Sequence, residues 1–289
     1  MMRRPLVSVI VPMYNHRKFI ERALLSVVMQ DYRPLQIIAI DDGSTDGTGI
    51  IARDFLSENM QSSILIIRKN RGAAETINEA IQISSGDYIN ILNSDDEFTL
   101  DRISHCVSAV QRLGKSMVFG DVEFINDINQ VAEPDEYIDA LRKVRQEVGS
   151  YPTLGFALMR NQLAISTGNF FFSRGLWEKI GPFRSYKYVH DWDFLLRSLY
   201  YEEPVFLSNI LYKYRLHGNN SFKELAHISA YETTEVMRNF VWSMVSKLPE
   251  NDRAPSPHYW PGVFEVLLER WKYHAYLPPR LRRHDGLRD

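Results

Sequence analysis

The sequence predicts an α/β protein with a mostly parallel central sheet and helices on both faces, followed by a helical C-terminal tail. Short β-branched runs alternate with amphipathic stretches over the first 124 residues, a pattern typical of strands joined by helical crossovers. These runs are almost continuously apolar, as expected of strands covered on both faces. With 289 residues, the chain is also long enough to bury a core without disulfide or metal staples.

Five runs of four to eight residues, rich in Ile and Val, are the expected strands: Leu6–Val11, Leu35–Ile40, Ile64–Ile67, Tyr88–Leu92 and Met117–Phe124. Apolar residues at helical spacing predict helices between them: Phe19, Ile20, Ala23, Leu24 and Val27; Ile51, Ala52, Phe55 and Leu56; Ile77, Ala80 and Ile81. A sheet of this kind binds ligands beyond the carboxyl ends of its strands. Functional residues are therefore expected at that edge.

The second half of the chain is less regular. Pro134, followed by Asp135 and Glu136, indicates a helix start within a block over 126–166 that we expect to lie over the sheet edge. An aromatic run, a helix and a strand are expected next: Phe170–Phe172, Asp191–Tyr201 and Ile210–Tyr214. Near the C-terminus one apolar stripe predicts a further helix: Phe264, Leu267, Leu268, Trp271 and Ala275.

Composition excludes several classes of protein. Lys and Arg total 34 against 36 Asp and Glu, a formal charge of −2, so nothing indicates a nucleic-acid binder. The single cysteine, Cys106, cannot form an internal disulfide or a Cys-based zinc site. No run reaches the roughly 18 to 20 apolar residues of a membrane span, and the N-terminus does not resemble a signal peptide. We expect a cytoplasmic protein, peripheral to the inner face of a membrane at most.

Two acidic segments follow predicted strands. The segment Asp41–Thr48 reads DDGSTDGT, which suits a turn with an N-cap and lacks the spacing of a calcium loop. The segment Asn93–Glu97 reads NSDDE. Adjacent carboxylates repel one another unless a cation or donor network compensates, and oxygen ligands favour magnesium or manganese. Two such loops on one sheet edge favour a ligand site there.

A third acidic segment and one histidine are further candidates. The segment His190–Asp193 reads HDWD and opens a predicted helix, where either aspartate could be a cap or a general base. His217 lies just past a predicted strand. A lone histidine of this kind is more often a surface or core residue than a ligand.

Taken in order, these segments resemble the family-two inverting glycosyltransferases. The resemblance covers about residues 5 to 221 and rests on an ordered set of motifs: Val9–Asn15 (VIVPMYN), Ile40–Thr48 (IDDGSTDGT), Asn70–Gly72 with Asn78, Gly86–Ile89, Asn93–Asp96 (NSDD), Thr167–Asn169, Trp177–Phe183 (WEKIGPF), His190–Asp193 and Tyr214–His217 (YRLH). Each motif alone is weak. The ordered set is specific.

The resemblance implies a Rossmann-like fold of the GT-A type, a divalent metal (Mn²⁺ or Mg²⁺), and sugar transfer with inversion. It implies a nucleotide-diphospho-sugar donor, with UDP-sugars preferred because Asp42 would accept a hydrogen bond from a ring imide. The acceptor would be a saccharide, a lipid-linked molecule or a protein, in the synthesis of a polysaccharide or glycoconjugate. The domains would be residues 1–221, with a nucleotide-sugar half (1–124) and an acceptor half (125–221), and a helical extension over 222–289.

Individual roles follow from the matched motifs. Asp191 would be the base, and the metal ligands would be Asp95, Asp96 and His217. Asp95 would also contact the donor. The other donor-binding residues would be Pro12, Tyr14, Asn15, Asp42, Asn70, Gly72 and Asn78, with Tyr14 against the nucleobase. The acceptor-binding residues would be Gly168, Asn169 and Trp192.

Two departures from the family pattern keep an alternative open. Asn93 stands where many relatives have an aspartate, and Ile77 precedes Asn78 where an arginine is frequent; Arg71 or His16 could supply that charge. The alternative is a nucleotide-sugar-binding or scaffolding protein with impaired turnover. A nucleotidyltransferase is disfavoured, because the loop after the first strand holds no glycine. The C-terminal segment is basic from Arg270 onward, so its helix either contacts a membrane or partner protein, or packs on the catalytic domain.

Overall fold

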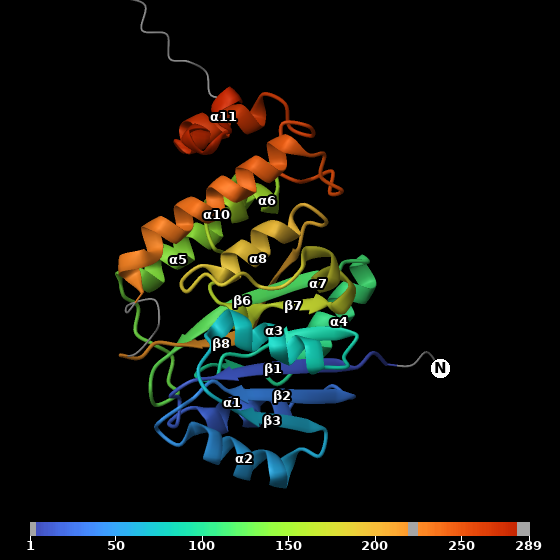
Figure 1. Cartoon of the computed structure of the whole chain (residues 1–289), viewed down its shortest axis with the longest axis vertical. Helices are drawn as coiled ribbons and strands as arrows, with labels where there is room; N and C mark the ends of the chain where they lie inside the picture. Colours follow the sequence, from blue (N-terminus) through green and yellow to red (C-terminus); the bar gives the residue numbers. More distant parts are fainter. Residues whose placement is uncertain (1–3, 219–224, 282–289) are drawn as a thin grey trace, which may run out of the picture.

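The computed structural model describes residues 4–218 and 225–281. Within these ranges the strands form one eight-stranded sheet in the order β3-β2-β1-β4-β7-β6-β8-β5 (Figure 1). The strands are β1 (Val7–Met13), β2 (Leu35–Asp41), β3 (Ser63–Ile67), β4 (Tyr88–Ile91), β5 (Glu97–Phe98), β6 (Met117–Ile125), β7 (Phe171–Ser173) and β8 (Val205–Arg215). The predicted α/β fold with helices on both faces is confirmed.

The first half of the chain follows the predicted alternation. Its helices are α1 (Ile20–Val28), α2 (Thr48–Asn59), α3 (Ala73–Ile83) and α4 (Arg102–Leu113). The strands β1 to β4 pair in parallel, and their side chains alternate between two cores. Ile10 and Ile38 join the core under α3, whereas Val9 and Ile37 join the core under α1, α2 and α4. Successive side chains of a strand point to opposite faces, so a continuously apolar strand supplies residues to both cores.

The first strand runs two residues further than predicted and includes Pro12. The carbonyl of Ile10 accepts a hydrogen bond from Leu92, on the β4 side of β1. Pro12, two residues on, faces the same side, but pairing with β4 has already ended at Ile10. A proline is tolerated there because no ladder bond needs its missing N–H.

The sheet is mixed rather than purely parallel. The three-residue β7 runs antiparallel to both β4 and β6, and β5 runs antiparallel to β8. The aromatic run explains β7, because Phe171 packs into one core and Phe172 into the other. The strand β8 begins at Val205, five residues before the predicted start, and carries register shifts against β6 near Asp121.

The second half of the chain adds further helices: α5 (Glu136–Gln146), α6 (Leu154–Arg160), α7 (Arg174–Ile180), α8 (His190–Ser198), α10 (Ala226–Ser246) and α11 (Val263–Arg270). Asp135 caps α5 by accepting a hydrogen bond from the Ile138 N–H. Figure 1 shows α8 between the sheet and α10. The buried side chains of α10, such as Val236 and Phe240, share one core with Phe194 of α8.

The last predicted helix is shorter than expected. The helix α11 ends at Arg270, because Lys272 has a left-handed backbone (φ 62°), and Tyr273–Tyr276 form a separate 3₁₀ turn. None of the helices in the described ranges combines the length and apolar character that crossing a membrane requires. The predicted domain boundary near residue 221 and the basic residues after Leu281 lie outside the described part of the chain.

Candidate active site

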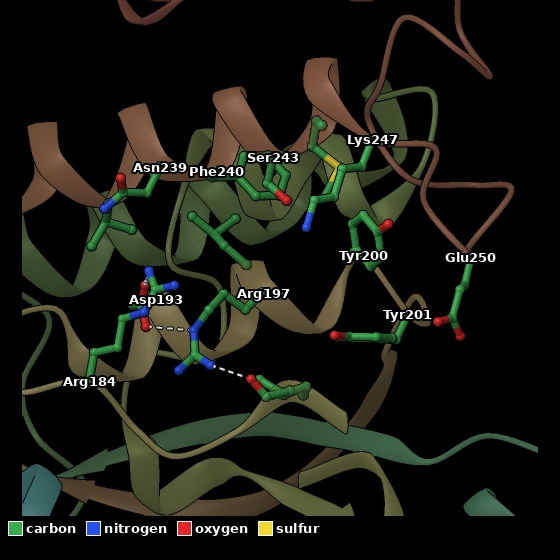
Figure 2. A pocket seen from close by; sticks show the side chains of 14 residues that line it. Arg184, Asp193, Arg197, Tyr200, Tyr201, Asn239, Phe240, Ser243, Lys247 and Glu250 are labelled. Carbon is green, nitrogen blue, oxygen red and sulfur yellow. Dashed lines mark hydrogen bonds and ion pairs between the residues drawn. The ribbon is translucent and has the colours of Figure 1, made fainter. Parts of the chain in front are cut away.

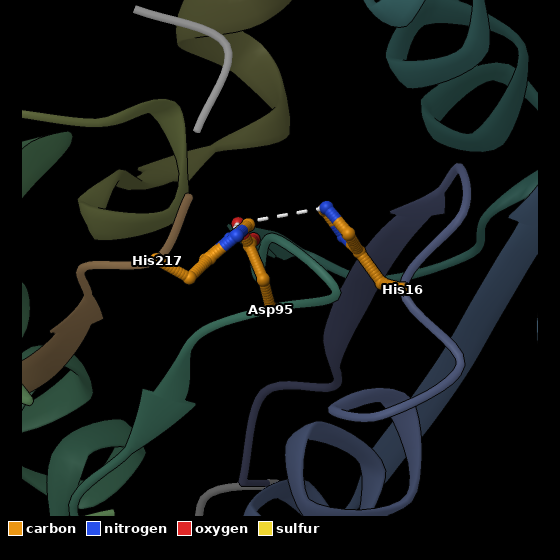
Figure 3. Close-up of side chains that lie close together, drawn as sticks. All are labelled: His16, Asp95 and His217. Atoms are coloured by element: carbon orange, nitrogen blue, oxygen red, sulfur yellow. Dashed lines mark hydrogen bonds and ion pairs between the residues drawn. The ribbon is translucent and has the colours of Figure 1, made fainter. Parts of the chain in front are cut away.

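The candidate site forms where β1, β2 and β4 end. His16 follows β1, Asp42 follows β2 and Asp95 follows β4, and these parallel strands are neighbours in the sheet. His217 reaches the same place from the end of β8 (Figure 3). The carboxyl ends of adjacent parallel strands meet at one edge, so side chains far apart in sequence converge there.

Within the described ranges, a cluster of metal-ligand type forms from His16, Asp95 and His217, with one ligand atom from each within 4.8 Å of the others. The Nε2 atoms of His217 and His16 lie 3.0 and 3.7 Å from Asp95 Oδ2. His16 Nδ1 lies 2.8 Å from Ser94 Oγ, and a partner on the second ring nitrogen is how metal-binding histidines are commonly oriented.

The electrostatics of the cluster keep Asp95 ionised. Burial alone would raise the pKa of Asp95, but the charge of His16 and the hydrogen bond and charge of His217 together outweigh it, and the pKa lies below its ordinary value. Mn²⁺ accepts two imidazoles and one carboxylate more readily than Mg²⁺, which prefers oxygen ligands and keeps its waters. The residues present therefore fit a divalent cation.

Asp96 lies beside the cluster but is engaged elsewhere. Its Oδ2 accepts a hydrogen bond from the Tyr212 hydroxyl and its Oδ1 accepts one from the Arg215 N–H. Burial and the charge of Asp95 raise its pKa well above the ordinary value. Arg215 also donates to the Asp95 carbonyl, at 2.6 Å, and to Glu97. No role was predicted for Arg215, yet its hydrogen bonds hold the acidic loop in place. Metal ligation by Asp96 stays a prediction.

Asp42 organises the loop that follows β3. Its carboxylate accepts hydrogen bonds from the Arg71 and Gly72 N–H groups, both at 2.8 Å, and pairs with Arg68. Gly43 (φ 82°) allows the close approach of this loop, because a Cβ there would meet the Asn70 nitrogen at 2.8 Å. The predicted donor residues Asp42, Asn70 and Gly72 are thus neighbours in one turn.

The loop after β1 contacts the loop after β2. Asn15 has a left-handed backbone (φ 55°), and its Oδ1 accepts a hydrogen bond from the Thr45 N–H at 2.9 Å. Tyr14 is half exposed beside it, at 50%. Pro12 pairs with Ile40 of β2 near the end of β1. An exposed aromatic ring at a strand end is available to stack on a base, which stays a prediction.

Asp191 is the second residue of α8 and keeps accepting capacity. Its Oδ2 accepts a hydrogen bond from Gln162 Nε2 at 2.9 Å, and its Oδ1 accepts one from the Trp192 N–H at 2.7 Å. Burial raises its pKa, against the lowering effect of the His190 charge and these hydrogen bonds. A raised pKa at a partly exposed carboxylate suits a general base.

A short bridge connects the acidic loop to α8. Asn93 Nδ2 donates to Ser166 Oγ at 2.8 Å, and Thr167 Oγ1 lies 3.1 Å from His190 Nε2. Asn93 therefore ties the loop to the Ser166–Asn169 segment and is not a member of the His16 cluster. An aspartate at position 93 could not donate this bond. The chain places Asp95 and Asp191 on either side of one bridge.

Three predicted binding residues form hydrogen bonds with the backbone of other segments. Asn78 forms two 2.8 Å hydrogen bonds with the N–H and carbonyl of Phe183. Asn169 is fully buried and bonds to both backbone groups of Gly120, and Trp192 is 8% exposed and donates to the Leu158 carbonyl. These contacts support the site from beneath, and direct ligand contact by Asn78, Asn169 or Trp192 stays a prediction.

Gly168 carries a testable steric constraint. A Cβ at Gly168 would lie 1.8 Å from the Tyr212 hydroxyl, which donates to Asp96. We expect Gly168→Ala to displace Tyr212 and to lower the free energy of unfolding by about 1 to 3 kcal/mol, as overpacking does. Urea unfolding measures the change. Gly175→Ala, where nothing lies within 4 Å of the new Cβ, should have no such cost; equal costs would contradict the expectation.

Sequence reasoning did not assign His16 as a ligand. His16 lies shortly after β1, and no spacing typical of metal ligands marks it. Only the pairing of β1 with β4 brings it to Asp95. A signal existed in the predicted sheet, because a histidine after one strand and carboxylates after its neighbour must share an edge.

The fold and this site define a GT-A type glycosyltransferase. The family model described as "Glycosyl transferase family 2" matches residues 8–181, more than half of the chain. The chain therefore belongs to glycosyltransferase family 2.

Relatives and solved structures agree with this assignment. An uncharacterized glycosyltransferase of Rickettsia typhi is 27% identical over 219 residues, 74% of this chain and 64% of that protein. Glycosyltransferase GlyG of Streptococcus pneumoniae serotype 4 is 34% identical over 116 residues, 40% of this chain and 38% of that protein. The chain thus spans less than two thirds of the length of these relatives.

Two solved structures share the fold. S. aureus TarS (residues 1–349), in complex with UDP-GlcNAc, has a TM-score of 0.63 and 19% identity, over 81% of this chain and 65% of that chain. The mannosyltransferase PcManGT from Pyrobaculum calidifontis, in complex with GDP-Man and Mn²⁺, has a TM-score of 0.58 and 18% identity, over 96% and 82%. The two neighbours bind different nucleotides, so they do not select one for this chain.

Proposed function

We propose that the chain transfers a sugar from a nucleoside diphosphate sugar to an acceptor hydroxyl, with inversion at the anomeric carbon. The observation that carries this proposal is the bridge at Ser166–Asn169, which bonds to Asn93 near the His16 cluster and to His190 beside Asp191. Burial, and after it charges that include those of Asp96, Asp95 and Asp191, raise the pKa of the Tyr214 phenol well above its ordinary value, as expected of a side chain that lies near both groups.

In the proposed reaction Asp191 accepts the proton of the acceptor hydroxyl. The hydroxyl oxygen forms a bond to the anomeric carbon while the bond from that carbon to the diphosphate oxygen breaks, and the electron pair leaves with the nucleoside diphosphate. A single displacement inverts the centre and needs no covalent intermediate. His16, Asp95 and His217 would hold a divalent cation, which when bound would neutralise charge on the leaving diphosphate.

The finer assignments are proposals as well. Uracil is the preferred base, because the Asp42 carboxylate can accept one more hydrogen bond, from a ring imide, beyond those from Arg68, Arg71 and Gly72. Polysaccharide or glycoconjugate synthesis and a cytoplasmic location complete the proposal. The described part of α11 packs Phe264 and Leu268 into the core, which favours packing on the catalytic domain over a free amphipathic helix.

A donor panel tests the function. The protein is incubated with Mn²⁺ and UDP-N-acetylglucosamine, UDP-glucose, UDP-galactose, dTDP-rhamnose or GDP-mannose, and release of nucleoside diphosphate is measured. We expect nucleoside diphosphate release from at least one of these donors, and more from a UDP-sugar than from dTDP-rhamnose or GDP-mannose. A chelator should abolish this release. Tight nucleotide binding without release under any acceptor would instead favour the impaired binding protein. Thermal shift with nucleoside diphosphates identifies the base independently, since a selective ligand raises apparent stability.

The raised pKa of Asp191 predicts a pH dependence. A base must be ionised, so release falls as pH decreases through this raised pKa, at a higher pH than for an ordinary carboxyl. Gln162→Glu replaces the donor to Asp191 by a like charge, which should move the acid limb up by about one pH unit. The pH profile of release measures it. Gln82→Glu, on the exposed face of α3, should leave the limb in place; an unmoved limb in Gln162→Glu would exclude Asp191 as its source.

A further inference from the structure

The segment that leads into α8 is held at both ends by side chains from other elements. At its start, the Asn78 amide of α3 brackets the backbone of Phe183. At its end, the Glu232 carboxylate of α10 receives three backbone N–H groups: Lys187 at 2.9 Å on Oε1, and Tyr188 at 2.7 Å and Val189 at 3.4 Å on Oε2. Asp191 follows two residues later.

Glu232 holds the residues that immediately precede α8. Val189 is the N-cap residue, and its own side chain provides no capping bond. Glu232 is only 8% exposed, and hydrogen bonds from backbone N–H groups to a buried carboxylate are among the stronger ones. Its negative charge also lies at the positive end of the helix dipole. The approach of the chain to α8 is therefore tied to a residue from the C-terminal segment.

The helices α8 and α10 share part of one core and also flank a pocket. Figure 2 shows a hollow between the two helices, a cavity of about 360 Å³ that is lined by Asp193 and Arg197 of α8 and by Asn239, Ser243 and Lys247 of α10. The apolar contacts of Val236, Phe240 and Phe194 lie beside this pocket, and the Glu232 carboxylate adds a polar contact between α10 and the start of α8.

We propose that Glu232 is a positioning residue for Asp191, so that α10, in the C-terminal segment, helps to place the catalytic base. This inference rests on the proposed function, in which Asp191 is the base. Glu232 holds residues 187–189 in one conformation, and these residues set the direction in which α8 starts and in which the Asp191 side chain points. A misplacement of the reacting group by about 1 Å can cost 100-fold in rate.

Glu232→Gln tests the proposal with little change of shape. The introduced amide places an N–H donor opposite at least one of the three backbone N–H groups, so at least one of these hydrogen bonds is lost. We expect faster hydrogen exchange at the amides of residues 187–189, at least about 10-fold slower release of nucleoside diphosphate, and a donor KM within about twofold. The matched control is Glu235→Gln, on the same helix, where Glu235 pairs with Arg238. This variant should behave as the wild type. Unchanged exchange protection in Glu232→Gln would overturn the proposal whatever the activity.

A double-mutant cycle separates this inference from the proposed function. If Glu232 acts through Asp191, Glu232→Gln should lower release in the wild-type background but add little to the residual release of Asp191→Asn. Equal fold losses in both backgrounds, with Asp191→Asn itself strongly impaired, would overturn only the role of Glu232. Wild-type release by Asp191→Asn would instead contradict the proposed function.

Discussion

Asp191→Asn should lower nucleoside diphosphate release by about 10²- to 10⁴-fold, the range that general base catalysis supplies. The introduced amide has nearly the shape of the carboxylate, and its oxygen can still accept the hydrogen bond from the Trp192 N–H. It cannot take a proton from an acceptor hydroxyl. The donor contacts on the other side of the bridge are untouched, so KM for the donor should change by less than about twofold, as for a group that acts only in the transition state.

The measurement compares release and nucleotide binding on the same preparations. Asp139→Asn is the matched control, because Asp139 lies on exposed α5 with a 3.6 Å contact to Arg142, and it should keep wild-type release. Thermal unfolding verifies that both variants fold. Equal release by Asp191→Asn and the wild type would remove Asp191 from the role of base, and loss of nucleotide binding would assign it to the donor site instead.

The sequence predicted the half of the fold in which local patterns decide the structure. Strands β1 to β4 are apolar and β-branched, and helices of regular period separate them, so propensity and burial agree there. The strand β7 has only three residues, and its direction depends on β4 and β6 on either side. The first half of β8 carries exposed polar residues such as Ser208 and Asn209, which resemble a loop until pairing with β6 is known.

Site residues were predictable from the sequence where the residue type alone indicates the chemistry. They were not predictable where the role of a side chain depends on its partners in the tertiary structure. Asp95 and His217 were both expected near a metal, and they meet at 3.0 Å. Asn78 and Asn169 have amides that suit a ligand equally well, but the amides clasp the backbone of Phe183 and Gly120. Glu232 lies beyond every motif, in a helix whose own sequence does not indicate its partners. Tertiary pairing supplies what spacing along the chain cannot.

Asp95→Asn should weaken Mn²⁺ binding by more than about 100-fold, since loss of an outer-sphere partner alone costs about 10- to 100-fold. The Asp95 carboxylate is the charged member of the cluster, and both histidines face its Oδ2. Titration of Mn²⁺ followed by electron paramagnetic resonance, with and without UDP, measures the affinity without any turnover. Asp101→Asn is the matched control, because Asp101 also pairs with a histidine, His105 at 3.3 Å, but on the exposed surface. Unchanged Mn²⁺ affinity in Asp95→Asn would place the metal elsewhere.

The contribution of His16 can be resolved in the same titration. Imidazole nitrogen favours Mn²⁺ over Mg²⁺, because Mg²⁺ prefers oxygen ligands and keeps its waters. His16→Gln removes one of two imidazoles and leaves Asp95 and His217 in contact. It should therefore weaken Mn²⁺ binding more than Mg²⁺ binding and narrow the preference between the two ions. A preference equal to that of the wild type would mean that His16 only orients Asp95, and that Asp95 and His217 hold the ion without it.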